Sequence, residues 1–147
     1  MLVFPRLVQQ GRVPNVDFLH LYGPGALHVL AGWYGVFGYT LEAERAFALI
    51  QNLGIVFALY ALTRPWGRTA ALGAGVVAAL LTMTPIGLAA LAWHGAVALA
   101  LWAAVVAIRA RNTSAVWAWA VAGLLGGVAL SFRPDGVVAV SLTILAA

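Results

Sequence analysis

The sequence predicts an all-α protein: a multi-spanning transmembrane helix bundle with an extracytoplasmic first loop. Of its 147 residues, 64% are hydrophobic and 8% are charged, and the mean hydropathy is +0.99. A soluble domain of this size could not bury so much apolar surface. The run 70–108 holds 39 residues without a formal charge when His94 is neutral. As one helix it would measure about 58 Å, roughly two bilayer cores, so we expect it to fold back on itself.

Composition also excludes several classes of protein. The chain has no cysteine, which excludes a disulfide framework and a thiolate metal site. The net charge of +4 comes from arginines that stand singly between apolar runs. Such arginines are typical of topology signals rather than of a phosphate-binding face, so we expect membrane lipids and no nucleic acid as partners.

The first elements are short. We expect an amphipathic helix over 1–10, a loop over 11–25 and an apolar helix over 26–37. The loop reads GRVPNVDFLHLYGPG and is rich in residues that favour turns. The helix of 12 residues would reach only about 18 Å, well under a bilayer core, which predicts a re-entrant or interfacial helix.

Longer apolar segments follow. Thr40, with Glu42 and Glu44 in the next turn, predicts a helix start. Pro85 predicts a hinge over 82–87, because proline removes a backbone donor. We expect transmembrane helices over 43–62, 70–84, 88–108 and 115–130, and the start of another over 136–147, where the sequence ends after 12 residues. The chain is therefore expected to be incomplete.

Orientation follows from the arginines. With Arg64, Arg68, Arg109 and Arg111 in the cytoplasm, the four spans alternate without conflict. We therefore expect a multi-pass protein of the cell (inner) membrane. The other charged groups then share the extracytoplasmic side, provided that 26–37 does not cross; they include Asp17, His20, Glu42, Glu44, Arg45, Arg133 and Asp135.

Two of these residues suit a reaction on an anionic, lipid-linked substrate. Asp17 could take a proton from an acceptor hydroxyl or hold a divalent ion, and Arg133 could pair with a phosphate through its planar fork. The alternative for Asp17 is a turn or helix-capping carboxylate beside Asn15. The alternative for Arg133 is a snorkelling side chain paired with Asp135.

Other polar residues allow two interpretations as well. His20 and Tyr22 stand two apart, so an extended loop could direct both to one substrate, or both could be interfacial packing. Arg45 could contact a phosphate or form a local ion pair with Glu42. His94 lies within a predicted span, as a functional group or as a neutral histidine bonded to a neighbouring helix. HExxH, Walker and Rossmann patterns are absent from the sequence.

The first part of the chain resembles a known family. It contains a Gly-x-x-Pro-x-x-Asp-Phe stretch, a Gly-Pro pair, an apolar helix ending in Phe-Gly and a following arginine, here Gly11, Pro14, Asp17, Phe18, Gly23, Pro24, Phe37, Gly38 and Arg45. This pattern is similar to the first extracytoplasmic loop of GT-C superfamily glycosyltransferases, integral-membrane enzymes that include protein O-mannosyltransferases and lipid A aminoarabinose transferases. The turn 132–135, Phe-Arg-Pro-Asp, resembles a later outward turn of the family.

The resemblance implies an activity and a site. Family members transfer a sugar from a polyprenyl-phosphate donor to a lipid or glycan acceptor on the outer face, with a loop carboxylate as general base and often a divalent metal such as Mg or Mn. It implies a catalytic, possibly metal-binding Asp17 and a basic residue, Arg133, near the lipid phosphate. We add His20, Tyr22, Arg45 and Asp135 as substrate-binding candidates.

The chain also departs from the family pattern. The family has a transmembrane helix and an acidic residue before this loop, whereas this chain has no acid before Asp17. The resemblance therefore implies an N-terminal fragment that lacks the first transmembrane helix and is inactive alone. It leaves Asp17 as either the base or a supporting carboxylate.

Two other classes remain open. A transporter or flippase subunit is expected to carry charges or broken helices near the bilayer midplane. Here the charges gather at the membrane edges and only His94 is well inside, which favours the enzyme. The third class is a non-catalytic membrane protein whose loop binds a partner.

The predicted orientation can be tested with single cysteines, because the chain has none of its own. We expect Asn15→Cys to react with an impermeant maleimide on intact cells and Asn112→Cys to react only after permeabilisation. Labelling of Asn112→Cys but not of Asn15→Cys from outside would overturn the orientation.

Overall fold

The computed structural model describes residues 3–84, 88–113 and 115–137. Over these ranges it contains six α-helices, two short 3-10 helices and no strand, so the predicted all-α class is confirmed. In chain order the helices are α1 (Val3–Gln9), α2 (Pro24–Phe37), α3 (Leu41–Thr63), η1 (Arg64–Trp66), α4 (Arg68–Thr82), α5 (Ala92–Thr113), α6 (Val116–Phe132) and η2 (Pro134–Gly136).

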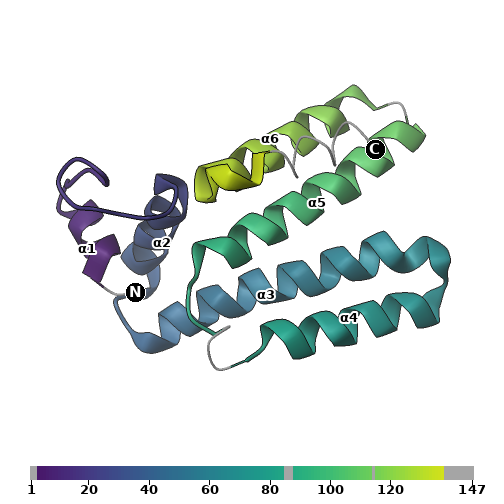
Figure 1. The fold of residues 1–147 in the computed structure, drawn as a ribbon, viewed down its shortest axis with the longest axis horizontal. Coiled ribbons are helices and arrows are strands. Elements are labelled where there is room, and N and C mark those ends of the chain that lie inside the picture. The colour runs from purple at the N-terminus through teal and green to yellow at the C-terminus, as the bar shows by residue number, and fades with distance from the viewer. Residues whose placement is uncertain (1–2, 85–87, 114, 138–147) are drawn as a thin grey trace.

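The four long helices lie side by side as a row (Figure 1). α5 packs between α6 and α3, and α3 packs against α4 on its other side. Short connections make successive helices antiparallel. α1, the loop after it and α2 lie together at one end of this row, the end where α3 begins (Figure 1). These N-terminal elements therefore sit next to the turns at that end.

Local sequence signals explain where two helices begin. The Thr40 hydroxyl oxygen accepts a hydrogen bond from the Ala43 backbone N–H at 3.1 Å, and the acidic side chains of the next turn favour the positive end of α3. Pro24 opens α2, where its missing N–H costs nothing, and Gly38 ends that helix with φ of +82°. The helix start predicted at Thr40 is confirmed.

The predicted segments agree with α2, α4 and α6 to within two residues at each end. The prediction for 88–108 is wrong at both ends, because α5 begins at Ala92 and continues through Arg109 and Arg111 to Thr113. Arginine is a good helix former and its charge stabilises the last turn, so these residues extend the helix. Of the predicted hinge, 85–87 lies outside the described residues, as does the predicted helix over 136–147 beyond Val137.

Two helices are long and apolar enough to cross a membrane: Leu41–Trp66, with 26 residues, and α5, with 22. α4 and α6 are apolar but shorter, with 15 and 17 residues, or about 22 and 25 Å. Two of the four predicted spans therefore meet the length expected for a bilayer core of about 30 Å.

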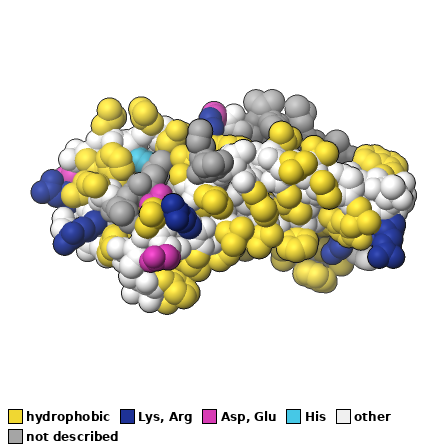
Figure 2. Space-filling view, turned by 90° about the horizontal axis from the view of Figure 1, so that it is seen from below, with side chains coloured by type: hydrophobic (Ala, Val, Ile, Leu, Met, Phe, Trp, Pro, Cys, Tyr) yellow, Lys and Arg dark blue, Asp and Glu magenta, His cyan; other side chains and the backbone are white. Residues whose placement is uncertain are grey.

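The outer surface of the row is apolar. Figure 2 shows hydrophobic side chains along its length, and Phe57, Leu72, Leu80 and Leu124 are more than half exposed. Contiguous exposed apolar surface of this kind marks an interaction with lipid or with other protein. The contacts between helices, by contrast, are made largely by alanine, and several alanines are completely buried: Ala48, Ala58, Ala71, Ala107 and Ala122.

A close backbone contact joins the N-terminal loop to the end of α6. The Gly23 N–H donates to the Phe132 carbonyl oxygen at 3.0 Å. A Cβ atom at Gly23 would lie 2.9 Å from the same oxygen and would collide with the carbonyl oxygen of Ser131. Both partners are backbone, so they cannot move aside as a flexible side chain would. Glycine is therefore required here for steric reasons.

Replacing Gly23 is expected to separate the loop from α6. We predict that Gly23→Ala destabilises the folded protein by about 1–3 kcal/mol, the usual cost of overpacking. Gly32→Ala is the matched control, because a Cβ at that position of α2 meets nothing within 4 Å. Alanine there is expected to stabilise the helix by about 0.5–1 kcal/mol. The measurement is thermal unfolding in detergent micelles, and equal midpoints for the two variants would contradict this account of the contact.

Candidate functional site

The loop before α2 is held by its own polar side chains. Asp17 Oδ2 accepts a hydrogen bond from the Val13 N–H at 2.7 Å, and Asn15 Oδ1 accepts one from the His20 N–H at 2.9 Å. Asn15 adopts φ of +64°, a conformation that asparagine tolerates better than most residues. The turn interaction considered for Asp17 is thus present. Its side chain is exposed, and its catalytic role stays a prediction.

Aromatic rings connect this loop to α1. The ring of Phe4 lies 5.7 Å from the rings of both Phe18 and His20, measured between centroids, and His20 lies 5.9 Å from Tyr22. Burial lowers the pKa of His20, because desolvation disfavours the imidazolium. His20 is therefore expected to be neutral near pH 7, with one ring nitrogen able to donate and the other able to accept.

Tyr22 lies beside the charged residues that follow α6. The Arg133 guanidinium carbon lies 5.8 Å from the centroid of the Tyr22 ring, within range of a cation–π interaction. Arg133 Nε donates to Asp135 Oδ1 at 2.9 Å, and a second guanidinium nitrogen donates to Oδ2. These paired hydrogen bonds raise the pKa of Arg133 and lower the pKa of Asp135. The ion pair expected as the alternative for Arg133 is present.

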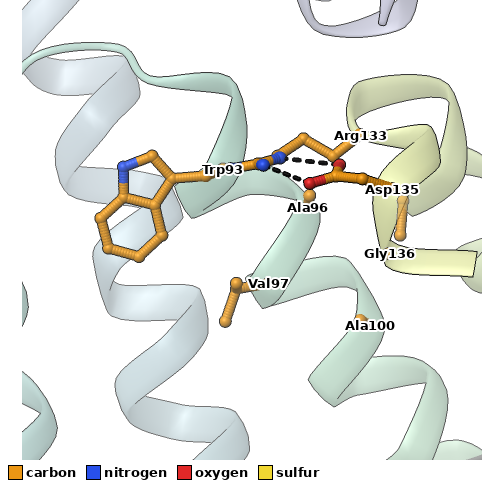
Figure 3. Close-up of a pocket in the computed structure, with 8 residues that line it drawn as sticks. Trp93, Ala96, Val97, Ala100, Arg133, Asp135 and Gly136 are labelled. Carbon is orange, nitrogen blue, oxygen red and sulfur yellow. Dashed lines mark hydrogen bonds and ion pairs between the residues drawn. The ribbon is translucent and has the colours of Figure 1, made fainter. Parts of the chain in front are cut away.

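This ion pair lies at one side of a cavity of about 340 Å³ between α5 and α6 (Figure 3). Apart from the pair, the lining is apolar or small: Trp93, Ala96, Val97, Ala100, Ala129 and Gly136. The alanines of α5 and α6 leave the space that larger side chains would fill. A guanidinium beside an apolar wall complements an amphiphile that has an anionic head and a hydrocarbon tail.

The structure brings together four of the predicted site residues: His20, Tyr22, Arg133 and Asp135. Arg45 is exposed in the second turn of α3, and within the described ranges it forms no ion pair with Glu42. The predicted local pair is therefore absent from this part of the chain.

Glu44 is a polar residue whose position the sequence did not reveal. Its side chain is only 5% exposed, and its Oε1 accepts from the Ala90 N–H at 3.4 Å. Burial and the nearby Glu44 carboxylate raise the pKa of Tyr34. The signal was available in the spacing of α3, because Glu44, Ala48 and Ile55 share the buried face of one helix.

Further polar groups are buried where α3, α4 and α5 meet. Asn52 Nδ2 donates to the Thr82 carbonyl oxygen at 3.3 Å. His94 is 1% exposed, and neither its Nδ1 nor Gln51 Oε1 has a hydrogen-bond partner among the described residues. A buried polar atom without a partner costs about 1–3 kcal/mol, so this level of the row fits a bound water or another polar group.

The divalent metal stays a prediction, and the described ranges hold no preformed cluster of ligands for it. No group of three or more histidine, aspartate or glutamate side chains comes together there. Mg²⁺ is usually held by one or two carboxylates together with substrate phosphates, and Asp17 already uses one oxygen within its turn. We therefore assign no step to a metal ion.

Comparison with known proteins identified no relative of this chain. No protein-family model, curated protein or solved structure matches the chain. The relation to GT-C glycosyltransferases therefore remains a resemblance in the motif residues of the loop and the turn at 132–135.

The buried position of Glu44 predicts a difference from its neighbour Glu42. Glu44→Ala is expected to lower the free energy of unfolding by about 1–3 kcal/mol, because it leaves the buried Ala90 N–H without its acceptor. Glu42→Ala removes the same charge from the same helix end at an exposed position and should stay within about 0.5 kcal/mol of the unmutated protein. Denaturant unfolding in mixed micelles measures both. Equal losses would show that only the helix-end charge matters.

Proposed function

We propose that this protein is an integral-membrane glycosyltransferase of the GT-C type, which binds a polyprenyl-phosphate sugar at its extracytoplasmic face. The observation that carries this proposal is the cavity of about 340 Å³ with an apolar wall and a guanidinium at its side. A polyprenyl phosphate has the matching polarity, because its tail is pure hydrocarbon and its head is an anion.

Membrane insertion is the first part of the proposal. The two long apolar helices and the exposed hydrophobic side chains of the row support it. We propose that α4 and α6 span as well, since a bilayer can thin locally around a short helix at a modest cost. α2, with 14 residues, would then lie in the interface beside the loop.

The proposed chemistry uses Tyr22, Arg133 and Asp135, which lie together, and Asp17 from the same loop as Tyr22. The guanidinium of Arg133 would bind the donor phosphate in place of, or shared with, the carboxylate of Asp135. Tyr22 would hold the guanidinium from its ring face. The acceptor hydroxyl oxygen would attack the anomeric carbon of the sugar while the bond from that carbon to the phosphate oxygen breaks. Asp17 is proposed to take the hydroxyl proton, and the polyprenyl phosphate would leave on the side of Arg133.

A transporter or flippase subunit is the second candidate, and one observation favours it. Gln51 and Asn52 in the middle of α3 and His94 in the first turn of α5 are buried polar side chains within the row of helices, and a transported polar group would need such partners. This class predicts that donor lipid binds without any transfer of its sugar, whereas the enzyme transfers it.

Photo-crosslinking to a diazirine-bearing polyprenyl phosphate in nanodiscs tests the site. We expect Arg133→Gln to lower crosslinking at least about tenfold, because hydrogen bonds to a charged group are worth roughly 1.5–3 kcal/mol. Asp135→Asn should keep or increase it, since the arginine loses a competing partner. Asp17→Asn should retain crosslinking but lose sugar transfer to an acceptor in the same membranes.

Arg12→Gln is the matched control, because it removes an exposed arginine elsewhere in the loop and should leave crosslinking unchanged. An equal loss in Asp135→Asn and Arg133→Gln would mean that the pair is structural. Normal transfer by both Asp17→Asn and Arg133→Gln would refute the assigned roles.

A further inference from the structure

A second cavity lies at the opposite end of the row, where α3 turns into α4 and α5 ends. Its volume is about 690 Å³, and it is lined by Phe57, Tyr60, Ala61, Arg64, Pro65, Trp102 and Arg109. Two guanidinium groups thus stand beside aromatic rings from two neighbouring helices. None of these residues belongs to the proposed donor site.

Among the described residues, the charged side chains at this end of the molecule are all basic. Arg68 and Arg111 follow the two cavity arginines within four residues along the chain. All four acidic residues of the sequence, Asp17, Glu42, Glu44 and Asp135, belong to the N-terminal loop, the start of α3 or the turn after α6, at the other end. Figure 2 agrees, since the right-hand end shows basic side chains without acidic ones. The net charge of +4 therefore arises wholly at this end.

The two cavity arginines have no acidic partner in the part of the chain that the structure describes. Neither the Arg64 nor the Arg109 side chain forms an ion pair or a hydrogen bond there. Trp102 is held in place, because its indole Nε1–H donates to the Gly54 carbonyl oxygen at 3.1 Å. The cavity thus offers a fixed aromatic wall and two guanidinium groups that can bind an anion.

An apolar groove continues from this cavity between α3 and α4. Its volume is about 450 Å³, and its lining is Val56, Phe57, Tyr60, Leu72, Gly75, Val76 and Ala79. Phe57 and Tyr60 line both spaces, so the two are adjacent. From Arg68 to Ala79 the helix rises about 17 Å, roughly half of a bilayer core and thus the depth of one leaflet.

We propose that this combined site binds an anionic phospholipid from the leaflet at this end of the molecule. Its phosphate would lie between Arg64 and Arg109, and one acyl chain would lie in the groove along α3 and α4. A free phosphate would leave the apolar groove unused, and a second copy of the chain would bring two basic ends together. Basic pockets between transmembrane helices are known to bind anionic headgroups.

The test measures lipid binding to the full chain in detergent by native mass spectrometry, with dioleoyl-phosphatidylglycerol and dioleoyl-phosphatidylcholine as probes. Phosphatidylglycerol is expected to bind more tightly to the unmutated protein. The double variant Arg64→Gln with Arg109→Gln should lose about 30-fold in affinity for it, since each arginine near the headgroup is worth about fivefold.

Arg68→Gln with Arg111→Gln is the matched control, because it removes the same two charges from the same end without changing the lining of the cavity. It should lose less than about fivefold. Equal losses in the two double variants would show general surface attraction and overturn the site, as would glycerol phosphate binding as tightly as the lipid. Circular dichroism checks folding. If the double variant fails to fold, Arg109→Gln alone decides, with an expected loss of about fivefold.

Discussion

The whole arrangement depends on close packing of helices through alanine. Ala107 of α5 and Ala122 of α6 are completely buried, and so are Ala48 and Ala58 of α3. In the proposed membrane setting, bringing two apolar helices together gains little hydrophobic free energy, so association would rest on van der Waals contact between closely approaching backbones. Small residues allow that approach. They also explain why the cavity of about 340 Å³ and the groove of about 450 Å³ lie at helix contacts, since alanine or glycine at a contact leaves space wherever the helices diverge slightly.

The single row of helices gives the molecule two different ends. At one end the acidic residues, four arginines and the polar loop share a small region, and Arg133 is neutralised by Asp135. At the other end, Arg64 and Arg109 have no acidic partner among the described residues. The cavity at the first end is lined by an arginine paired with an aspartate, and the cavity at the other end by Arg64 and Arg109, for which the described residues provide no acidic partner. At the proposed donor site, a phosphate would replace the Asp135 carboxylate as the partner of Arg133. At the proposed lipid site, a phosphate would bind arginines that have no carboxylate partner among the described residues.

Local signals in the sequence predicted the helices and the turns but not the packing of their side chains. The Thr40 cap, the loop over 11–25 and the Arg133–Asp135 pair depend on residues a few positions apart, and each is present in the structure. The spacing of Glu44 from Ala48 and Ile55 places it on the buried face of α3, but its partner, the Ala90 N–H, comes from the segment before α5 and could not be predicted from local sequence. The contact of Tyr22 with Arg133 joins residues more than 100 positions apart, so the sequence could place them on one side of the membrane but not side by side.

The Arg133–Asp135 pair bears directly on how an anionic donor would bind. The arginine at the edge of the apolar cavity has a partner, and both side chains of the pair stay accessible to solvent, 36% for Arg133 and 61% for Asp135. The turn of η2 supplies that partner only two residues away, so the pair itself has no net charge. A phosphate accepts two parallel hydrogen bonds in the same geometry as a carboxylate, and exchange of one for the other keeps the guanidinium satisfied throughout. Donor affinity would then depend on the difference between two similar interactions, and the contact of the polyprenyl tail with Trp93, Val97 and the alanines of α5 would supply most of the selectivity for a lipid-linked anion over a soluble one.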